Sequence, residues 1–193
     1  MERTMHINTP KRCSWCGTDP IYIDYHDNEW GIPIKDDHAL FELLLLEGAQ
    51  AGLSWITILK KRENYRIAFD SFNAEKMATY GQDKHEKLLN DSGIVRNKLK
   101  VKAFTKNAIA YLKIRKRGTS FSDFLWQFTD HKVITNQWQN ASEVPVSTPK
   151  SAAMSESLKK AGFSFVGPTI CYAFMQSSGM VNDHITSCFK HGH

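Results

Sequence analysis

The chain has 193 residues and a mass of 22.1 kDa, which is enough for one domain with a full hydrophobic core. Hydrophobic residues make up 41% of the chain and charged residues 23%, and this composition excludes a disordered protein. No apolar run approaches the roughly 18 residues that span a bilayer, and the first residues lack the apolar segment of a secretory signal. We therefore expect no membrane partner and a cytoplasmic location. The net charge of +5 favours a polyanionic partner.

Helical patterns dominate the sequence. Capping residues, apolar periodicity and closing glycines predict helices over residues 38–47, 55–69, 74–80, 84–90, 95–117, 122–128, 151–161 and 169–178. Residues 21–25 alternate apolar and polar side chains and are expected to be extended, and residues 129–146 to form a long connection. Because no alternation of strands and helices occurs, the sequence predicts an all-α domain of seven to nine short helices.

Glu47 is the most informative acidic residue. It follows Leu40, Leu43 and Leu44 at helical spacing, so its carboxylate falls on the apolar face of its helix. A buried carboxylate must be paired, protonated or held for a ligand. One interpretation is a carboxylate that turns to the helix edge or pairs with an arginine. The other is a binding site for a flat, cationic or amino-bearing ring, which the nearby Trp55 favours.

Four large aromatic residues crowd the segment before that helix. They are Trp15, Tyr22, Tyr25 and Trp30. Such rings could form the wall of a pocket for a planar ligand, or they could pack an N-terminal segment onto the helical body. Composition alone does not choose between these interpretations.

Cysteine and histidine residues lie near both ends of the chain. Four cysteines are too few for a disulfide scaffold, and without a secretory signal we expect them to be reduced. Two pairs of ligands far apart in the sequence could close a tetrahedral Zn²⁺ site that ties the ends together. Spacing alone favours Cys13, Cys16, His184 and Cys188. His26, His191 or His193 could replace one of them, and a chain without metal is an equal alternative.

A short turn at residues 91–96 joins two predicted helices. A hairpin of this kind can direct backbone amides and a helix N-terminus toward a phosphate. Gly93 lies in the turn, and Arg96 and the lysines after it add positive charge. The sequence is equally consistent with a basic helix that only faces solvent.

Several long stretches together resemble one family. They are residues 12–15 (RCSW), 25–31 (YHDNEWG), 47–55 (EGAQAGLSW), 60–65 (KKRENY), 165–167 (FVG) and 181–184 (VNDH). In this order they resemble the DNA-3-methyladenine glycosylase I family of bacterial base-excision repair enzymes, which belongs to the helix-hairpin-helix superfamily. The resemblance runs from Arg12 to Cys188. It implies a single catalytic domain over residues 12–189, with residues 1–11 and 190–193 as mobile tails.

The resemblance also implies roles for individual residues. One structural zinc ion would be bound by Cys13, His26, His184 and Cys188, with Cys16 outside the family pattern. Glu47 would be the catalytic residue. The base pocket would be formed by Trp15, Tyr22, Tyr25 and Trp55. DNA would contact Gly52, Leu53, Gly93 and Arg96, and Leu53 would enter the gap left by the flipped nucleotide.

The function implied is hydrolysis of the N-glycosidic bond of 3-methyladenine in double-stranded alkylated DNA after base flipping. The enzyme would be monomeric and monofunctional, without strand cleavage, and would act on the bacterial nucleoid. Two alternatives remain at this point. One is a zinc-stabilised DNA-binding module without glycosylase chemistry, and the other is a related glycosylase that selects a different base.

Overall fold

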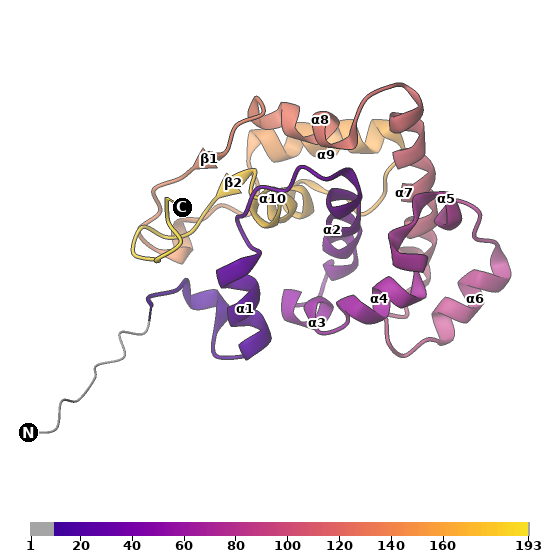
Figure 1. Cartoon of the computed structure of the whole chain (residues 1–193), viewed down its shortest axis with the longest axis horizontal. Coiled ribbons are helices and arrows are strands. Elements are labelled where there is room, and N and C mark those ends of the chain that lie inside the picture. Colours follow the sequence, from indigo (N-terminus) through magenta and orange to yellow (C-terminus); the bar gives the residue numbers. More distant parts are fainter. Residues whose placement is uncertain (1–9, 193) are drawn as a thin grey trace, which may run out of the picture.

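The computed structural model describes residues 10–192, and these form a predominantly helical structure (Figure 1). Ten α-helices occur in this range: α1 (Pro20–Asn28), α2 (Asp37–Gln50), α3 (Trp55–Leu59), α4 (Arg62–Ala68), α5 (Ala74–Met77), α6 (Gln82–Asn90), α7 (Lys98–Lys116), α8 (Phe121–Trp126), α9 (Pro149–Ala161) and α10 (Pro168–Ser177). Two short strands, β1 (Ile134–Thr135) and β2 (Val181–Asn182), pair in parallel. The prediction of a helical domain is therefore confirmed, with ten α-helices in the described residues where seven to nine were expected.

Helix α2 is at the centre of the molecule. Its N-terminus is capped by Asp36, whose side chain accepts a hydrogen bond from the Ala39 amide. Its apolar residues point to several sides, as is typical of a helix packed by neighbours all round. Helix α10 packs beside it, and α3, α7 and α8 also contact it. Glu47 is therefore held on a central, well-packed helix.

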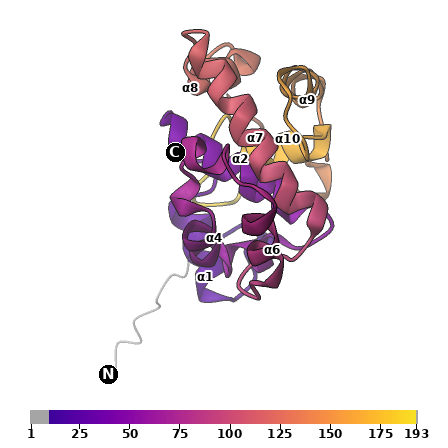
Figure 2. The ribbon, with the colours of Figure 1, turned by 90° about the vertical axis from the view of Figure 1, so that its right-hand side faces the viewer.

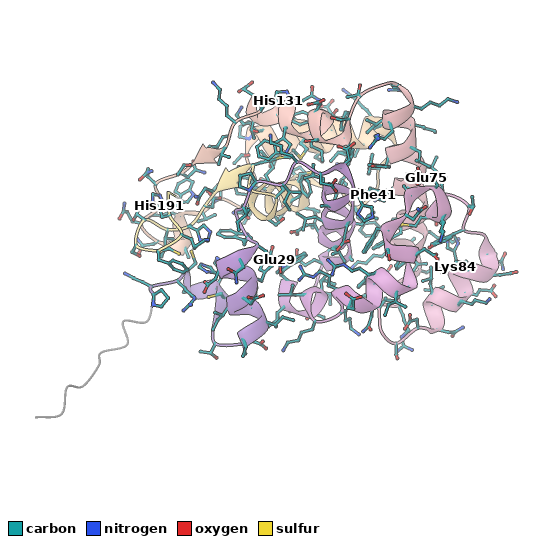
Figure 3. All side chains as sticks on the ribbon, in the orientation of Figure 1. Glu29, Phe41, Glu75, Lys84, His131 and His191 are labelled. Atoms are coloured by element: carbon teal, nitrogen blue, oxygen red, sulfur yellow. The ribbon has the colours of Figure 1, made fainter. Side chains whose placement is uncertain are left out.

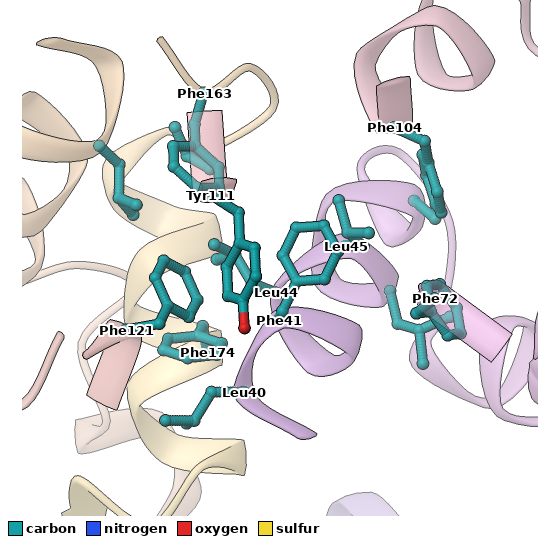
Figure 4. Packing of buried hydrophobic residues seen from close by; sticks show 14 of the residues in the cluster. Leu40, Phe41, Leu44, Leu45, Phe72, Phe104, Tyr111, Phe121, Phe163 and Phe174 are labelled. Carbon is teal, nitrogen blue, oxygen red and sulfur yellow. The ribbon is translucent and has the colours of Figure 1, made fainter. Parts of the chain in front are cut away.

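Aromatic side chains fill the space between α2 and the helices around it (Figure 4). The ring of Phe41 lies 4.5 Å from that of Tyr111, which lies 5.0 Å from Phe121. On the other side of α2, Phe69 and Phe104 stack with ring centroids 4.3 Å apart. Burial of each such ring contributes about 1.5–3 kcal/mol to folding, so this core fixes α2 against α7 and α8.

The prediction of an extended segment at residues 21–25 is wrong, because these residues lie inside α1. Asp19 caps the helix by accepting a hydrogen bond from the Ile21 amide, and Pro20 occupies its first position. These two start signals outweigh the short alternation of apolar and polar residues. As a helix, the segment places Tyr22, Tyr25 and His26 within little more than one turn.

The predicted helix over residues 55–69 is divided in two. Helix α3 ends at Leu59, and α4 begins at Arg62 after a turn in which the Lys61 amide donates to the Ile58 carbonyl. The division lets the two halves face different neighbours. Trp55 on α3 meets Tyr25 of α1, whereas Tyr65 on α4 stacks on Phe104 of α7.

The two ends of the described chain lie together. The Phe189 amide donates to the Lys11 carbonyl, and His191 contacts the Asn136 carbonyl at 3.0 Å; Figure 3 shows His191 beside the connection that carries β1. Lys11 and His191, which the sequence assigns to the tails, thus have defined contacts. Of the other tail residues, 1–9 and 193 lie outside the described residues.

Helix α7 crosses the face of the molecule seen in Figure 2, with α4 and α6 below it. Seven residues separate the end of α6 at Asn90 from the start of α7 at Lys98, and they form the predicted hairpin. Within residues 10–192, no helix has both the length and the apolar character needed to cross a membrane.

Candidate active site and metal-ligand cluster

A cavity of about 390 Å³ opens between α1, α2, α3 and α10. The residues predicted to bind a base, together with Glu47, all line it. Its other lining residues are Cys13, Trp30, Gln50, Ala141, Val144, Pro145, Val146, Thr169, Tyr172, Ala173, Gln176, Asp183 and Ile185. The volume and the largely aromatic wall suit one small planar ligand.

Glu47 lies in this cavity with its side chain almost fully buried, as its position among leucines predicts. Its carboxyl oxygen accepts one hydrogen bond, from the Ser177 hydroxyl of α10 at 2.8 Å. Burial raises the pKa of the Glu47 carboxyl to about 8, and the Ser177 hydrogen bond offsets only part of this effect. The cavity therefore holds an acidic group whose ionisation becomes favourable when a cation or hydrogen-bond donor enters.

Aromatic rings form one wall of the cavity. Trp15 lies 5.0 Å from Tyr22 and 4.9 Å from Trp30, measured between ring centroids, and Tyr25 lies 5.5 Å from Trp55. These rings pack the N-terminal segment onto the helical body, and they also line the cavity. Stacked and tilted rings of this kind favour a flat ligand, and a cationic one most strongly.

The Trp55 indole N–H is a polar group without a partner. In the part of the chain that the structure describes, it is the single buried side-chain nitrogen or oxygen that makes no hydrogen bond. Buried donors are nearly always paired in folded proteins, so this N–H of a cavity-lining residue remains available to a hydrogen-bond acceptor. Trp55 thus contributes a donor as well as a ring.

Asp183 is a second buried carboxylate at the cavity wall. It accepts hydrogen bonds from Asn136 and Trp138 of the long connection, and from Tyr172 and Gln176 of α10, at 2.7–2.8 Å. These four contacts hold the connection against α10. Since Ala141 and residues 144–146 of the same connection line the cavity, Asp183 fixes one of its walls.

Four side chains from the two ends of the chain meet beside the cavity. They are Cys13, His26, His184 and Cys188, and their potential ligand atoms all lie within 4.8 Å of one another. Cys188 Sγ is 3.5 Å from both His26 Nε2 and His184 Nδ1, and Cys13 Sγ is 3.6 Å from His184 Nδ1. Zinc bond lengths and tetrahedral angles require a separation of about 3.6 Å between sulfur and nitrogen ligands. The cluster could therefore hold a metal ion.

The other nitrogen of each histidine ring is held by the protein. His26 Nδ1 lies 2.8 Å from the Asp27 carboxylate, which also pairs with Arg12, and His184 Nε2 lies 3.3 Å from the Trp30 carbonyl. These contacts direct the second nitrogen of each ring into the cluster, as is usual for histidine ligands of metals. His26 Nε2 also accepts a hydrogen bond from the Cys13 amide at 3.3 Å. Burial lowers the pKa of both histidines, which keeps the rings neutral and able to bind a cation.

Other candidate ligands stay outside the cluster. Cys16, favoured by spacing alone, is buried, and its thiol lies 3.2 Å from the Cys13 carbonyl. His191 contacts the Asn136 carbonyl instead, and His193 lies outside the described residues. The ligand set that contains His26 is the one the structure brings together.

The residues expected to contact DNA lie on two loops. Gly52, with a φ of +79°, and Leu53, 40% exposed, form the turn between α2 and α3. Arg96 is exposed in the hairpin, whereas the Gly93 amide donates to the Asp91 side chain and the Val95 amide to the Tyr65 hydroxyl. Two of the backbone amides in this hairpin therefore donate to groups of the protein itself, and not to a phosphate.

Comparison with known proteins identifies the family. The methyladenine glycosylase family matches residues 15–191. DNA-3-methyladenine glycosylase 1 of Escherichia coli (strain K12) is 52% identical over 178 residues, which cover 92% of this chain and 95% of that protein. DNA-3-methyladenine glycosylase of Haemophilus influenzae is 51% identical over 177 residues, covering 92% and 96%.

Solved structures agree with the sequence comparison. A crystal structure of 3-methyladenine DNA glycosylase I superposes with a TM-score of 0.93 at 51% identity, over 94% of this chain and all of that one. The enzyme from Staphylococcus aureus, solved to explain its recognition of 3-methyladenine, gives a TM-score of 0.91 at 37% identity, covering 94% and 97%. The chain belongs to the methyladenine glycosylase family, whose members hydrolyse N-glycosyl bonds.

Some residues of the site were not predicted from the sequence. Ser177 and Asp183 are the clearest cases, because their importance comes from contacts with distant segments. A weaker signal did exist in α10. Thr169, Tyr172 and Gln176 place polar groups at helical spacing on an otherwise apolar helix, which indicates a face that meets a cavity.

Proposed function

We propose that the protein removes 3-methyladenine from alkylated double-stranded DNA by hydrolysis of its N-glycosidic bond, without cutting the strand. The observation that carries the proposal is Glu47, a buried carboxyl with one hydrogen bond in a cavity walled by aromatic rings. Relatives with about half of their residues identical are named for this activity. One related structure contains 3-methyladenine itself.

The leaving group explains why the site needs little acid–base machinery. Methylation at N3 gives the nucleotide base a positive charge. When the bond between C1′ and N9 breaks, its electron pair neutralises that charge, so the base leaves without being protonated. Water then bonds to C1′ and releases one proton. The enzyme must therefore extrude the nucleotide and stabilise the charged base in the cavity.

Selection of the charged base follows from the cavity wall. An aromatic face attracts a desolvated cation by about 0.5–2 kcal/mol more than a neutral ring. Glu47 would accept a hydrogen bond from the exocyclic amino group and would ionise as the cation enters, which returns its pKa toward the ordinary value. The Trp55 indole would donate to a ring nitrogen.

DNA would approach the surface formed by the two loops. We propose that Leu53 fills the gap left by the flipped nucleotide, with Gly52 allowing the close approach of the backbone. The α6–α7 hairpin would act as a helix-hairpin-helix element in which Gly93 and the exposed Arg96 meet the phosphates. The lining of the cavity includes no lysine among the described residues, which supports a monofunctional mechanism.

We further propose one structural zinc ion in the cluster. Cys13, His26, His184 and Cys188 would hold it, and its chemistry would be to tie the two ends of the chain together rather than to activate water. All four side chains are buried, and four protein ligands would leave no open position for the water that a catalytic zinc ion binds. The protein would act as a monomer on the bacterial nucleoid.

Chromatography of bases released from methylated DNA tests the proposal directly. The expected result is release of 3-methyladenine with intact strands. Binding of DNA without any released base would favour the zinc-stabilised binding module. Release of a different base as the main product would favour a related glycosylase with altered selectivity. Either of these results would overturn the proposed function.

A further inference from the structure

A buried lysine joins the start of α7 to the end of α2. Lys100 is 93% buried, since 7% of it is exposed, and its ammonium group donates to the carbonyl oxygens of Ala49 at 2.7 Å and Ala51 at 2.6 Å. Carbonyl groups at a helix C-terminus lack partners within the helix and carry partial negative charge, so a cation is well placed there. Lys100 thereby holds the backbone immediately before the loop of Gly52 and Leu53.

A second lysine joins the turn between α3 and α4 to the α6–α7 hairpin. Lys61, in the turn between α3 and α4, donates to the carbonyl oxygens of Ser92 at 3.0 Å and Gly93 at 3.3 Å. The hairpin is also close to α4 at this point, because a Cβ atom on Gly93 would lie 3.1 Å from the Asn64 side chain. Lys61 thereby holds the hairpin against the segment that follows the Leu53 loop.

Together the two lysines close a ring of contacts. The ring runs from the end of α2 through the Leu53 loop and α3 to Lys61, crosses to the hairpin, continues into α7 and returns through Lys100 to α2. Neither loop can shift relative to the other without breaking a hydrogen bond to an ammonium group, and such bonds are stronger than neutral ones. The ring lies behind both loops of the DNA-facing surface.

We propose that Lys61 and Lys100 are positioning residues that fix the Leu53 loop and the Gly93 hairpin at one separation, so that the two engage a DNA duplex as a single unit. This inference rests on the proposed function, because it assumes that both loops meet DNA. It adds two residues that touch neither base nor phosphate but determine how well the protein binds the distorted duplex.

A positioning role of the two lysines predicts a result that a merely structural role does not. Binding of a duplex requires both loops, whereas binding of the free base requires only the cavity. Loss of either lysine should therefore weaken duplex binding at least tenfold while leaving the affinity for free 3-methyladenine within twofold of wild type. Because either loss opens the same ring, Lys61→Met and Lys100→Met combined should cost little more than one of them alone.

The experiment compares Lys61→Met, Lys100→Met, the double variant and Lys100→Arg, which keeps the charge and should recover most of the loss. Lys113→Met, at an exposed position on α7, is the matched control and should behave as wild type. Two affinities are measured for each: for a duplex with an abasic-site analogue, and for free 3-methyladenine by tryptophan fluorescence. KM and kcat for excision are measured in parallel, and the loss should fall mainly on KM.

Equal losses in both affinities, or multiplicative losses in the double variant, would overturn the inference and indicate general destabilisation. If Lys100→Met does not fold, the half-exposed Lys61 still supplies the comparison of the two affinities. The outcome stays separate from the proposed function: a wild-type protein that releases no base from methylated DNA overturns that function, whereas the affinities test the ring independently.

Discussion

The cavity and the Cys/His cluster lie side by side but differ in how their polar groups are satisfied. In the cluster, each histidine has a protein partner on its outer nitrogen, and its inner nitrogen lies 3.5 Å from Cys188 Sγ. In the cavity, Glu47 has one hydrogen bond and the Trp55 N–H has none. The cluster is thus organised for stability, whereas the cavity keeps unsatisfied groups that a ligand would complete.

Adjacent residues of one helix supply both regions. Tyr25 of α1 faces the cavity and His26 of the same helix joins the cluster, and the Trp15 ring lies 5.2 Å from that of His26. The comparison therefore predicts different consequences for substitutions on the two sides. Those in the cluster should lower stability, and those in the cavity should lower activity at little cost in stability.

The largest effect should follow loss of a cluster residue. Cys188→Ser should lower the free energy of unfolding by about 4 kcal/mol when zinc exceeds its dissociation constant a thousandfold, as measured by chemical denaturation. Metal analysis should show one zinc per chain in wild type. Cys16→Ser is the control, because this buried thiol lies outside the cluster, and it should cost less than about 1 kcal/mol. Equal costs for the two variants would contradict the zinc proposal.

Glu47→Gln should have the next largest effect, on activity. The amide cannot oppose the charge of the base, so excision of 3-methyladenine should fall on the order of 10²-fold while the helix content is unchanged. Single-turnover kinetics measures the chemical step. Ser177→Ala, which keeps the carboxyl and removes its hydrogen bond, should lose much less. Excision by Glu47→Gln at the wild-type rate would remove this residue from the mechanism.

The raised pKa of Glu47 also predicts how stability depends on pH. The folded protein binds this proton up to about pH 8, whereas the unfolded chain releases it near the ordinary value of 4.5. The folded state therefore holds more protons between these limits, and its stability falls as the pH rises through them. Relative to Glu47→Gln, wild type should lose about 2 kcal/mol between pH 6 and pH 8. A constant difference across this range, in denaturation curves of both proteins, would contradict the assignment.

Trp55→Phe should have the smallest effect. The aromatic face remains, but the unpaired indole N–H is lost, so the affinity for free 3-methyladenine should fall by about 1 kcal/mol. Removal of a buried donor without a partner offsets part of the packing loss, so the stability should change little. Isothermal titration measures the affinity, and an unchanged value would show that the indole donates to no ligand atom.

Much of the helical fold could be predicted from local signals. Asp36, Asn73, Ser120 and Thr148 cap α2, α5, α8 and α9, which are among the predicted helices, because an N-cap depends only on residues close in sequence. The position of Glu47 among leucines likewise predicted its burial. The prediction at residues 21–25 was wrong because a short alternation of apolar and polar residues is a weaker signal than a helix N-cap, here Asp19.

Contacts between distant segments could not be predicted in the same way. Spacing favoured Cys16 as a metal ligand, and the choice of His26 came from the family resemblance, since only the folded chain brings positions 13, 26 and 184 together. The Ser177 contact with Glu47 spans 130 positions. The strands β1 and β2 pair although helices α9 and α10 lie between them in the sequence. Local periodicity contains no information about such pairings.

The distance along the chain between the cluster residues has a consequence for biosynthesis. Cys13 and His184 are 171 positions apart, and Cys188 comes later still. During synthesis, the cluster cannot assemble around Cys13 and His26 until nearly all of the remaining chain, including His184 and Cys188, has been made. A nascent or prematurely terminated polypeptide therefore lacks a complete cluster beside its aromatic wall.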